Sequence, residues 1–137
     1  MRTPPSLTPA SKRGSVAIEF AFLLPVVLGL LSGVVDWGWY LSREADLEDC
    51  TRDAARTGVL NTDASDPAVL AEQRLQESLS ALGFDLAGAT VTAAVEMDPT
   101  LDDEVLSVSV RLPHAPMIGL VPSPSELTAQ VVMLAPS

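Results

Sequence analysis

The longest pattern in the chain is an apolar run near its start, without a charged residue from Phe20 to Val35. A single acid, Asp36, ends this run, and it is followed by three aromatic residues, Trp37, Trp39 and Tyr40. A helix of about 20 apolar residues crosses the roughly 30 Å hydrocarbon core of a bilayer, and aromatic residues gather where such a helix meets water. The pattern predicts a transmembrane helix over residues 15–41. Asp36 should lie near the outer headgroups, where its carboxylate can reach water.

The segment before the helix is polar, and one proline lies within the helix itself. Met1 to Ser11 is rich in proline, serine and threonine and is expected to be disordered, and Lys12 to Gly14 is expected to form a basic hinge. Pro25 lacks a backbone N–H group and should kink or loosen the helix. Gly29 and Gly33 have the spacing that lets two helices approach closely in lipid.

Beyond residue 41 the hydrophobic period continues to indicate helix. One face carries small and apolar residues at helical spacing, namely Leu47, Cys50, Ala54 and Gly58. A second helix is expected to begin at Ser65 or Asp66, with Pro67 in its first turn, and to stop at Gly83. Its apolar stripe consists of Ala71, Leu75, Leu79 and Leu82. Cys50 is thus expected to be a small core residue rather than a reactive one.

The period then changes from helical to alternating, which predicts strands. Three segments alternate, with inward positions expected at Val91, Ala93, Val95 and Met97, then at Leu106, Val108, Val110 and Leu112, and finally at Leu127, Ala129, Val131 and Met133. The predicted fold class is α+β: a long N-terminal transmembrane helix continues into a small domain, residues 42–137, with a second helix and a three-stranded antiparallel sheet. Between the second and third strands, Pro113 to Pro124 is proline-rich yet apolar. This loop either folds back onto the core or touches a partner, and the core is favoured.

Charge is distributed unevenly about the apolar run. Arg2, Lys12 and Arg13 precede it, whereas acids dominate the chain after it, and the formal net charge is −10. The positive-inside rule therefore places the N-terminus in the cytoplasm and residues 42–137 outside it, with one pass through the membrane. The acidic balance argues against nucleic-acid binding, which needs clustered lysine and arginine.

Enzyme chemistry has no support in the sequence, so we predict that the chain is not an enzyme and binds no cofactor or metal. The one histidine, His114, lies between prolines without a nearby cysteine, which favours a structural or solvated residue over a metal ligand. Neither a phosphate-binding loop nor a nucleophile elbow is present.

Glu19 is the residue that calls for an explanation, because a carboxylate at the edge of hydrocarbon is costly unless it is paired or reaches water. It is the fifth residue counted from Ser15, which comes after Gly14, and the aromatic Phe20 comes next. The stretch G-S-V-A-I-E-F resembles the prepilin processing site of the type IV pilus superfamily. Serine after the glycine and phenylalanine after the glutamate resemble the tight-adherence (Tad, or Flp) branch.

The next segment is similar to TadE-like minor pilins, also called pseudopilins, and TadF-like proteins share this N-terminus. The matching groups are Glu19-Phe20-Ala21, Leu24-Pro25 and Asp36-Trp37-Gly38. The resemblance implies that a prepilin peptidase removes residues 1–14 as a leader by cutting between Gly14 and Ser15. It also implies that the chain acts as a minor pilin subunit in assembling a Tad pilus for adhesion or secretion, with Glu19 and Phe20 at assembly contacts. The partners would be the other Tad pilins and the inner-membrane assembly platform.

The N-terminus has two other interpretations. A cleaved secretory signal would have a shorter apolar core and a small-residue cleavage site after it. An uncleaved signal anchor carrying an extracytoplasmic binding or sensor domain is the main alternative. It predicts an intact residue 1–14 segment and indifference to the substitution Gly14→Leu.

Overall fold

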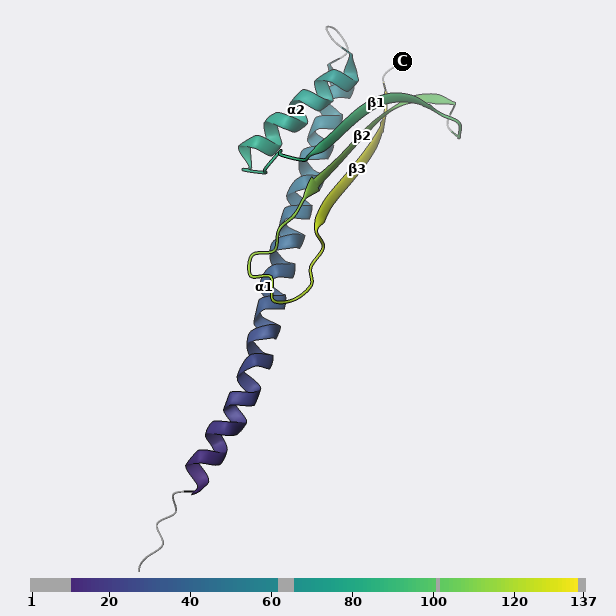
Figure 1. The fold of residues 1–137 in the computed structure, drawn as a ribbon. Coiled ribbons are helices and arrows are strands. Elements are labelled where there is room, and N and C mark those ends of the chain that lie inside the picture. The colour runs from purple at the N-terminus through teal and green to yellow at the C-terminus, as the bar shows by residue number, and fades with distance from the viewer. Residues whose placement is uncertain (1–10, 62–65, 101, 136–137) are drawn as a thin grey trace, which may run out of the picture.

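The protein is described by a computed structural model over residues 11–61, 66–100 and 102–135, with the backbone alone described for residues 11–15. The expected disorder of Met1 to Ala10 lies outside these residues. The elements follow the order helix, helix and three strands (Figure 1). This arrangement confirms the predicted α+β class.

Helix α1 spans Ser11–Leu60, 50 residues without a break. At 1.5 Å per residue it is about 75 Å long, far more than a bilayer requires. The helix continues on both sides of Pro25, so the proline does not end it. The expected hinge at Lys12 to Gly14 is wrong, because these residues are helical. Lysine and arginine are good helix formers, and one glycine costs only about 1 kcal/mol relative to alanine.

Helix α2 (Pro67–Ala81) packs against the C-terminal half of α1. The Asp66 side chain caps it by accepting a hydrogen bond from the Ala68 N–H group at 3.0 Å. The predicted inward residues Ala71, Leu75 and Leu79 are all buried. Gly83 comes after the helix with a φ of +70°, the left-handed conformation that glycine adopts at helix ends. Leu82 is predicted to face inward, but it is half exposed because it lies just past the last helical turn.

The three strands form an antiparallel meander in the order β1 (Thr90–Asp98), β2 (Asp103–Pro113) and β3 (Glu126–Leu134). In the central strand, Val108 lies opposite Ala93 of β1 and Val131 of β3. One face of the sheet covers both helices: β2 and β3 contact α1, and β1 contacts α2.

The core lies between the sheet and one stripe of α1. The predicted inward residues of α1 are buried, and so are the inward residues of β2. Gly58 is needed where the two helices approach each other. A Cβ atom at this position would lie 2.6 Å from the Pro67 carbonyl oxygen and 2.8 Å from Leu106 Cδ2.

The β1–β2 hairpin departs from the predicted inward pattern at its outer end. Val95 and Met97 are expected to face the core, yet both are exposed. Figure 1 shows the reason: this end of the hairpin extends beyond the two helices, so its inner face has no layer to cover.

Candidate functional site

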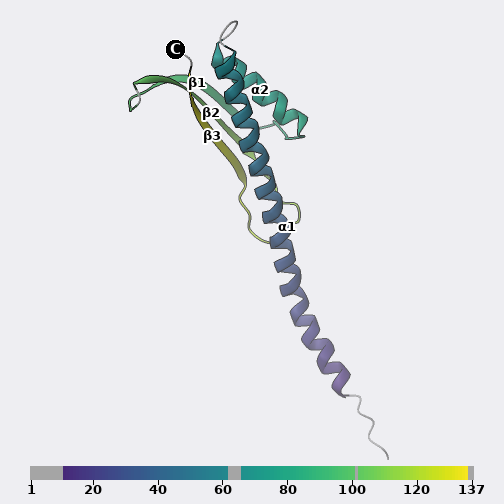
Figure 2. The same ribbon diagram turned by 180° about the vertical axis from the view of Figure 1, so that it is seen from behind.

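The N-terminal part of α1 is an apolar surface that the rest of the described chain leaves uncovered. From Val16 to Leu31 every large apolar side chain is at least two-fifths exposed. Figures 1 and 2 show, from opposite sides, that this part of α1 projects away from the folded domain. Among the described residues, α1 is the one helix long and apolar enough to cross a membrane.

The predicted assembly residues lie on this projecting part. Phe20 is 63% exposed, and Glu19 is exposed beside it. The predicted processing residues Gly14 and Ser15 lie one turn earlier, within the helical backbone. The structure thus places all four residues within two turns of α1, and neither Glu19 nor Phe20 contributes to the domain core.

A different acid, Asp36, is held by three hydrogen bonds. Its carboxylate accepts hydrogen bonds from the backbone N–H groups of Ile118, at 2.7 Å, and Gly119, at 2.9 Å. The Ser32 hydroxyl donates to it from one turn earlier, at 3.4 Å. Asp36 is fully buried, so the expectation that it reaches water near the headgroups is wrong. A loop 82 residues away in the sequence covers it instead.

That loop, residues 114–125, connects β2 to β3, and we call it the proline loop. It folds onto α1 rather than onto the domain core, so the favoured expectation is right about folding back and wrong about the surface it meets. Val121 packs 3.7 Å from the position that a Gly33 Cβ atom would occupy. Met117, Ile118 and Leu120 remain exposed. Gly33 is therefore used for contact with the loop, whereas nothing approaches Gly29.

Aromatic residues continue this contact toward the domain. The Tyr40 ring lies edge-on to Trp37, with centroids 6.1 Å apart, and edge-on to His114, at 5.4 Å. The His114 Nε2 atom is buried without a hydrogen-bond partner. Burial lowers the pKa of His114 below its usual value, and the positive charge of Arg43 lowers it further, while Asp36 opposes the shift. His114 is thus a neutral packing residue at pH 7, which agrees with the structural role expected for it.

Arg43 joins α1 to the end of α2, a contact that no pattern in the sequence indicates. Its guanidinium carbon lies 4.6 Å from the ring centre of Trp39 and 4.5 Å from that of Phe84. It also donates a hydrogen bond to the Leu82 carbonyl oxygen at 3.1 Å. Stacking on two rings orients a cation well, so Arg43 fixes where the chain leaves α2.

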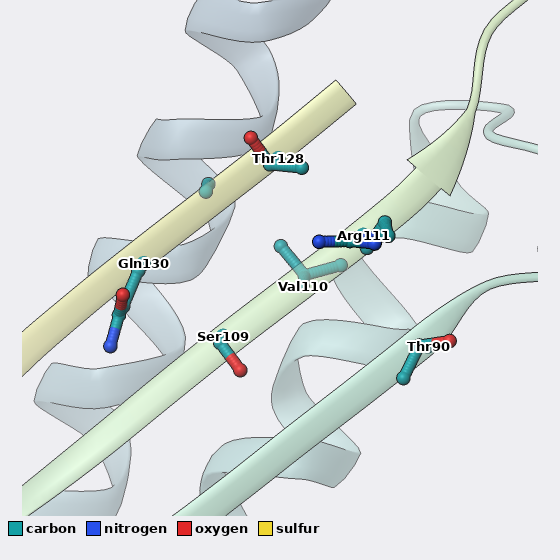
Figure 3. A pocket seen from close by; sticks show the side chains of 7 residues that line it. Thr90, Ser109, Val110, Arg111, Thr128 and Gln130 are labelled. Carbon is teal, nitrogen blue, oxygen red and sulfur yellow. The ribbon is translucent and has the colours of Figure 1, made fainter. Parts of the chain in front are cut away.

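The outer face of the sheet carries a hollow of about 520 Å³ (Figure 3). Its polar lining consists of Thr90, Ser109, Arg111, Thr128 and Gln130. Arg111 lies 3.9 Å from Glu126 in an exposed ion pair. A hydroxyl needs an adjacent base to act as a nucleophile, and none of the lining residues is a histidine or a carboxylate.

Cys50 and the acidic residues also lack the geometry of a reactive or metal site. Cys50 is buried in the core, as predicted. Burial raises the pKa of its thiol, and the carboxylates of Asp46, Asp53 and Asp49 raise it further, which makes the thiolate unfavourable. Within the described ranges, no three histidine, cysteine or carboxylate side chains come together to hold a metal ion.

Comparison with known proteins identifies the N-terminal third of the chain. Residues 14–56 match the family model described as TadE-like protein. The matched segment begins at the predicted processing site and includes Glu19, Asp36 and three of the four predicted core residues of α1, with only Gly58 beyond it. No curated protein and no solved structure matches the chain. The resemblance to TadE-like proteins is thus confirmed over these residues.

Proposed function

From the TadE-like sequence of residues 14–56, we propose that this chain is a minor pilin, or pseudopilin, that takes part in assembling a Tad (Flp, type IVb) pilus for adhesion or secretion. One observation carries the proposal. A sequence similar to a prepilin processing site lies at the N-terminal end of an exposed apolar helix, and the C-terminal part of the same helix packs in a folded domain. A subunit that passes from lipid into a bundle of helices needs both parts: an apolar helix that can exchange lipid for other helices, and a separate folded domain.

The chain would be made as a precursor. A prepilin peptidase would cut between Gly14 and Ser15 and release residues 1–14. Residues 15–41 would remain as a transmembrane helix, and residues 42–137 would form the extracytoplasmic domain. The basic residues Lys12 and Arg13 support a cytoplasmic N-terminus in the inner membrane.

Glu19 would set the register of assembly. Cleavage creates a new ammonium group at Ser15, and in a helix bundle the ammonium of one subunit can neutralise Glu19 of its neighbour. A pair of this kind adds little net stability, because both charges lose water, but a misaligned subunit leaves a charge unpaired. Phe20 would pack beside this pair. The other Tad pilins and the inner-membrane assembly platform would be the partners.

The first test is the intact mass of the membrane-extracted protein, expressed with and without a cognate prepilin peptidase. We expect a peptidase-dependent loss of residues 1–14, which Gly14→Leu abolishes. Gly29→Leu is the matched control, since a Cβ atom there would meet nothing within 4 Å and the position is 15 residues from Gly14. An unchanged mass beside an active peptidase would favour the uncleaved, signal-anchored binding or sensor domain.

The second test separates processing from assembly. Glu19→Ala should be cleaved normally but fail to enter sheared pili or cross-linked assemblies, whereas Glu104→Ala, which removes an exposed carboxylate near the start of β2, should behave as wild type. Phe20→Ala and Phe22→Ala form a second matched pair, since both rings are exposed on α1. We expect the larger assembly defect at Phe20. Normal assembly of Glu19→Ala would contradict the register role.

A further inference from the structure

The tip of the proline loop, residues 116–121, is exposed and strongly apolar. Met117 is 62% exposed, Ile118 50% and Leu120 68%. The proline loop as a whole contains no charged residue. Exposed apolar patches on small domains mark surfaces that contact a partner or a membrane.

The position of the tip along α1 indicates which partner this is. Asp36 and Gly33 hold the tip, so it lies level with the end of the uncharged run Phe20 to Val35. That run is 16 residues, about 24 Å of helix, and a bilayer core of about 30 Å needs some four residues more. Because Glu19 and the basic flank limit the run at its start, the core must extend toward Trp37 and Trp39. The tip therefore lies at the outer boundary of the hydrocarbon.

The backbone of the proline loop is suited to this depth. Irregular backbone is poorly tolerated near hydrocarbon because its N–H groups lose water. Three of the twelve residues of the loop are prolines, which have no N–H group. Asp36 accepts hydrogen bonds from two further N–H groups, those of Ile118 and Gly119. The His114 N–H group donates to the Ser125 carbonyl oxygen at 2.8 Å.

The geometry points to a second membrane contact: we propose that the side chains of Met117, Ile118 and Leu120 insert into the outer leaflet beside α1. The lipid acyl chains that cover α1 then also cover the tip, which is continuous with the apolar groove between Val121 and α1. Since the loop carries no lysine or arginine, insertion should not depend on anionic headgroups. The inference rests on the proposed function only in requiring that α1 spans a membrane.

The test uses the full chain in phosphatidylcholine vesicles that contain a lipid with a nitroxide quencher on its acyl chain. A fluorophore is attached at Leu120→Cys, Val27→Cys or Thr128→Cys, each in a Cys50→Ala background. We expect strong quenching at position 27, in the middle of the uncharged run Phe20 to Val35, and at position 120, with none at position 128 on the outer face of the sheet. Replacing a third of the lipid by phosphatidylglycerol should leave the quenching unchanged.

The outcomes separate this inference from the proposed function. Quenching at position 27 but not at 120 overturns the inference and leaves the membrane anchor intact. A label at 120 that is shielded both from the lipid quencher and from aqueous iodide is covered by protein, which also overturns it. Quenching at neither position rejects the membrane span itself, and the inference with it.

A measurement on the unsubstituted chain guards against effects of the labels. A lipid with a photoactivatable diazirine in its acyl chain is cross-linked to the full chain, and the adducts are mapped by mass spectrometry. Adducts are expected on α1 and on the peptide that contains residues 117–120. Adducts on α1 alone would overturn the inference.

Discussion

The two halves of α1 are one continuous helix, yet their side chains suit different surroundings. The half before Val35 is apolar on every side and is covered by little in the described chain, whereas the half after Arg43 is apolar on one stripe that is buried. A helix with apolar residues all round belongs in lipid or in the interior of an assembly, and one with a single stripe belongs on the surface of a domain. Both halves form the same helix, so the pattern of apolar side chains, and not the backbone, determines which surroundings each half suits.

The largest expected effect comes from the same truncation in each half. Leu47→Ala should lower the free energy of unfolding of the domain by about 3 kcal/mol, because Leu47 is fully buried and truncation leaves a cavity. Leu28→Ala, at a side chain that is 50% exposed, should change it by less than about 0.5 kcal/mol. Urea titration of the full chain in detergent measures both. Equal effects would mean that the halves do not differ as described.

A smaller effect is expected from adding a methyl group to a glycine. Gly58→Ala should destabilise the domain by about 2 kcal/mol, because the new Cβ atom would crowd the Pro67 carbonyl oxygen and the Leu106 side chain. Gly38→Ala, on the same helix with open space around it, should be neutral or stabilise by up to about 1 kcal/mol through helix propensity. The same titration applies. A neutral Gly58→Ala would contradict the close approach of α1 and α2.

At the junction of the two halves, Asp36→Ala should act locally. It leaves the N–H groups of Ile118 and Gly119 without their acceptor, at a cost of roughly 1–2 kcal/mol. Amide hydrogen exchange at these two residues should become faster, while exchange in β2 stays unchanged. Asp49→Ala, at an exposed carboxylate on the same helix, is the control. Unchanged exchange at Ile118 would show that Asp36 does not hold the loop.

The smallest effect concerns pH. The pKa of His114 is lowered in the folded state, so the unfolded chain binds a proton first as the pH falls. Stability should therefore be constant above the usual histidine pKa of about 6.5 and should decline as the pH falls from there toward the folded pKa. His114→Gln should remove this part of the pH dependence, as measured by urea titration between about pH 7.5 and 5.5. An identical slope in the variant would contradict the prediction.

Much of the fold follows from local sequence periods, and the departures have a common cause. The stripe of α1, the stripe of α2 up to Leu79 and the alternation in β2 are each set by residues near one another in the chain. Asp36 was misplaced because its partners, Ile118 and Gly119, come from a loop that only the sheet brings back to α1. Val95 and Met97 were misplaced because alternation assigns a side chain to a face but does not set the extent of the layer beneath it.

The candidate site divides in the same way. Gly14, Ser15, Glu19 and Phe20 form a short linear pattern, which a sequence can reveal without a fold. The contact of Arg43 with Phe84 and the Leu82 carbonyl oxygen joins segments about 40 residues apart, and arginine is too common on helices to mark such a contact in advance.

The unbroken course of α1 also fixes a direction. Successive helical residues turn by about 100°, so Asp36 and Ala54, eighteen residues apart, share one azimuth. The proline loop and the domain core thus contact the same side of α1, and the described residues on its opposite side, such as Val27, Val34, Ala45 and Arg52, are exposed. Because α1 is continuous between its N-terminal part and the domain, the orientation of the domain about the helix axis is set by the rotation per residue of the helix. One residue inserted between Asp36 and Leu47 would rotate the domain by about 100° relative to the N-terminal part of α1.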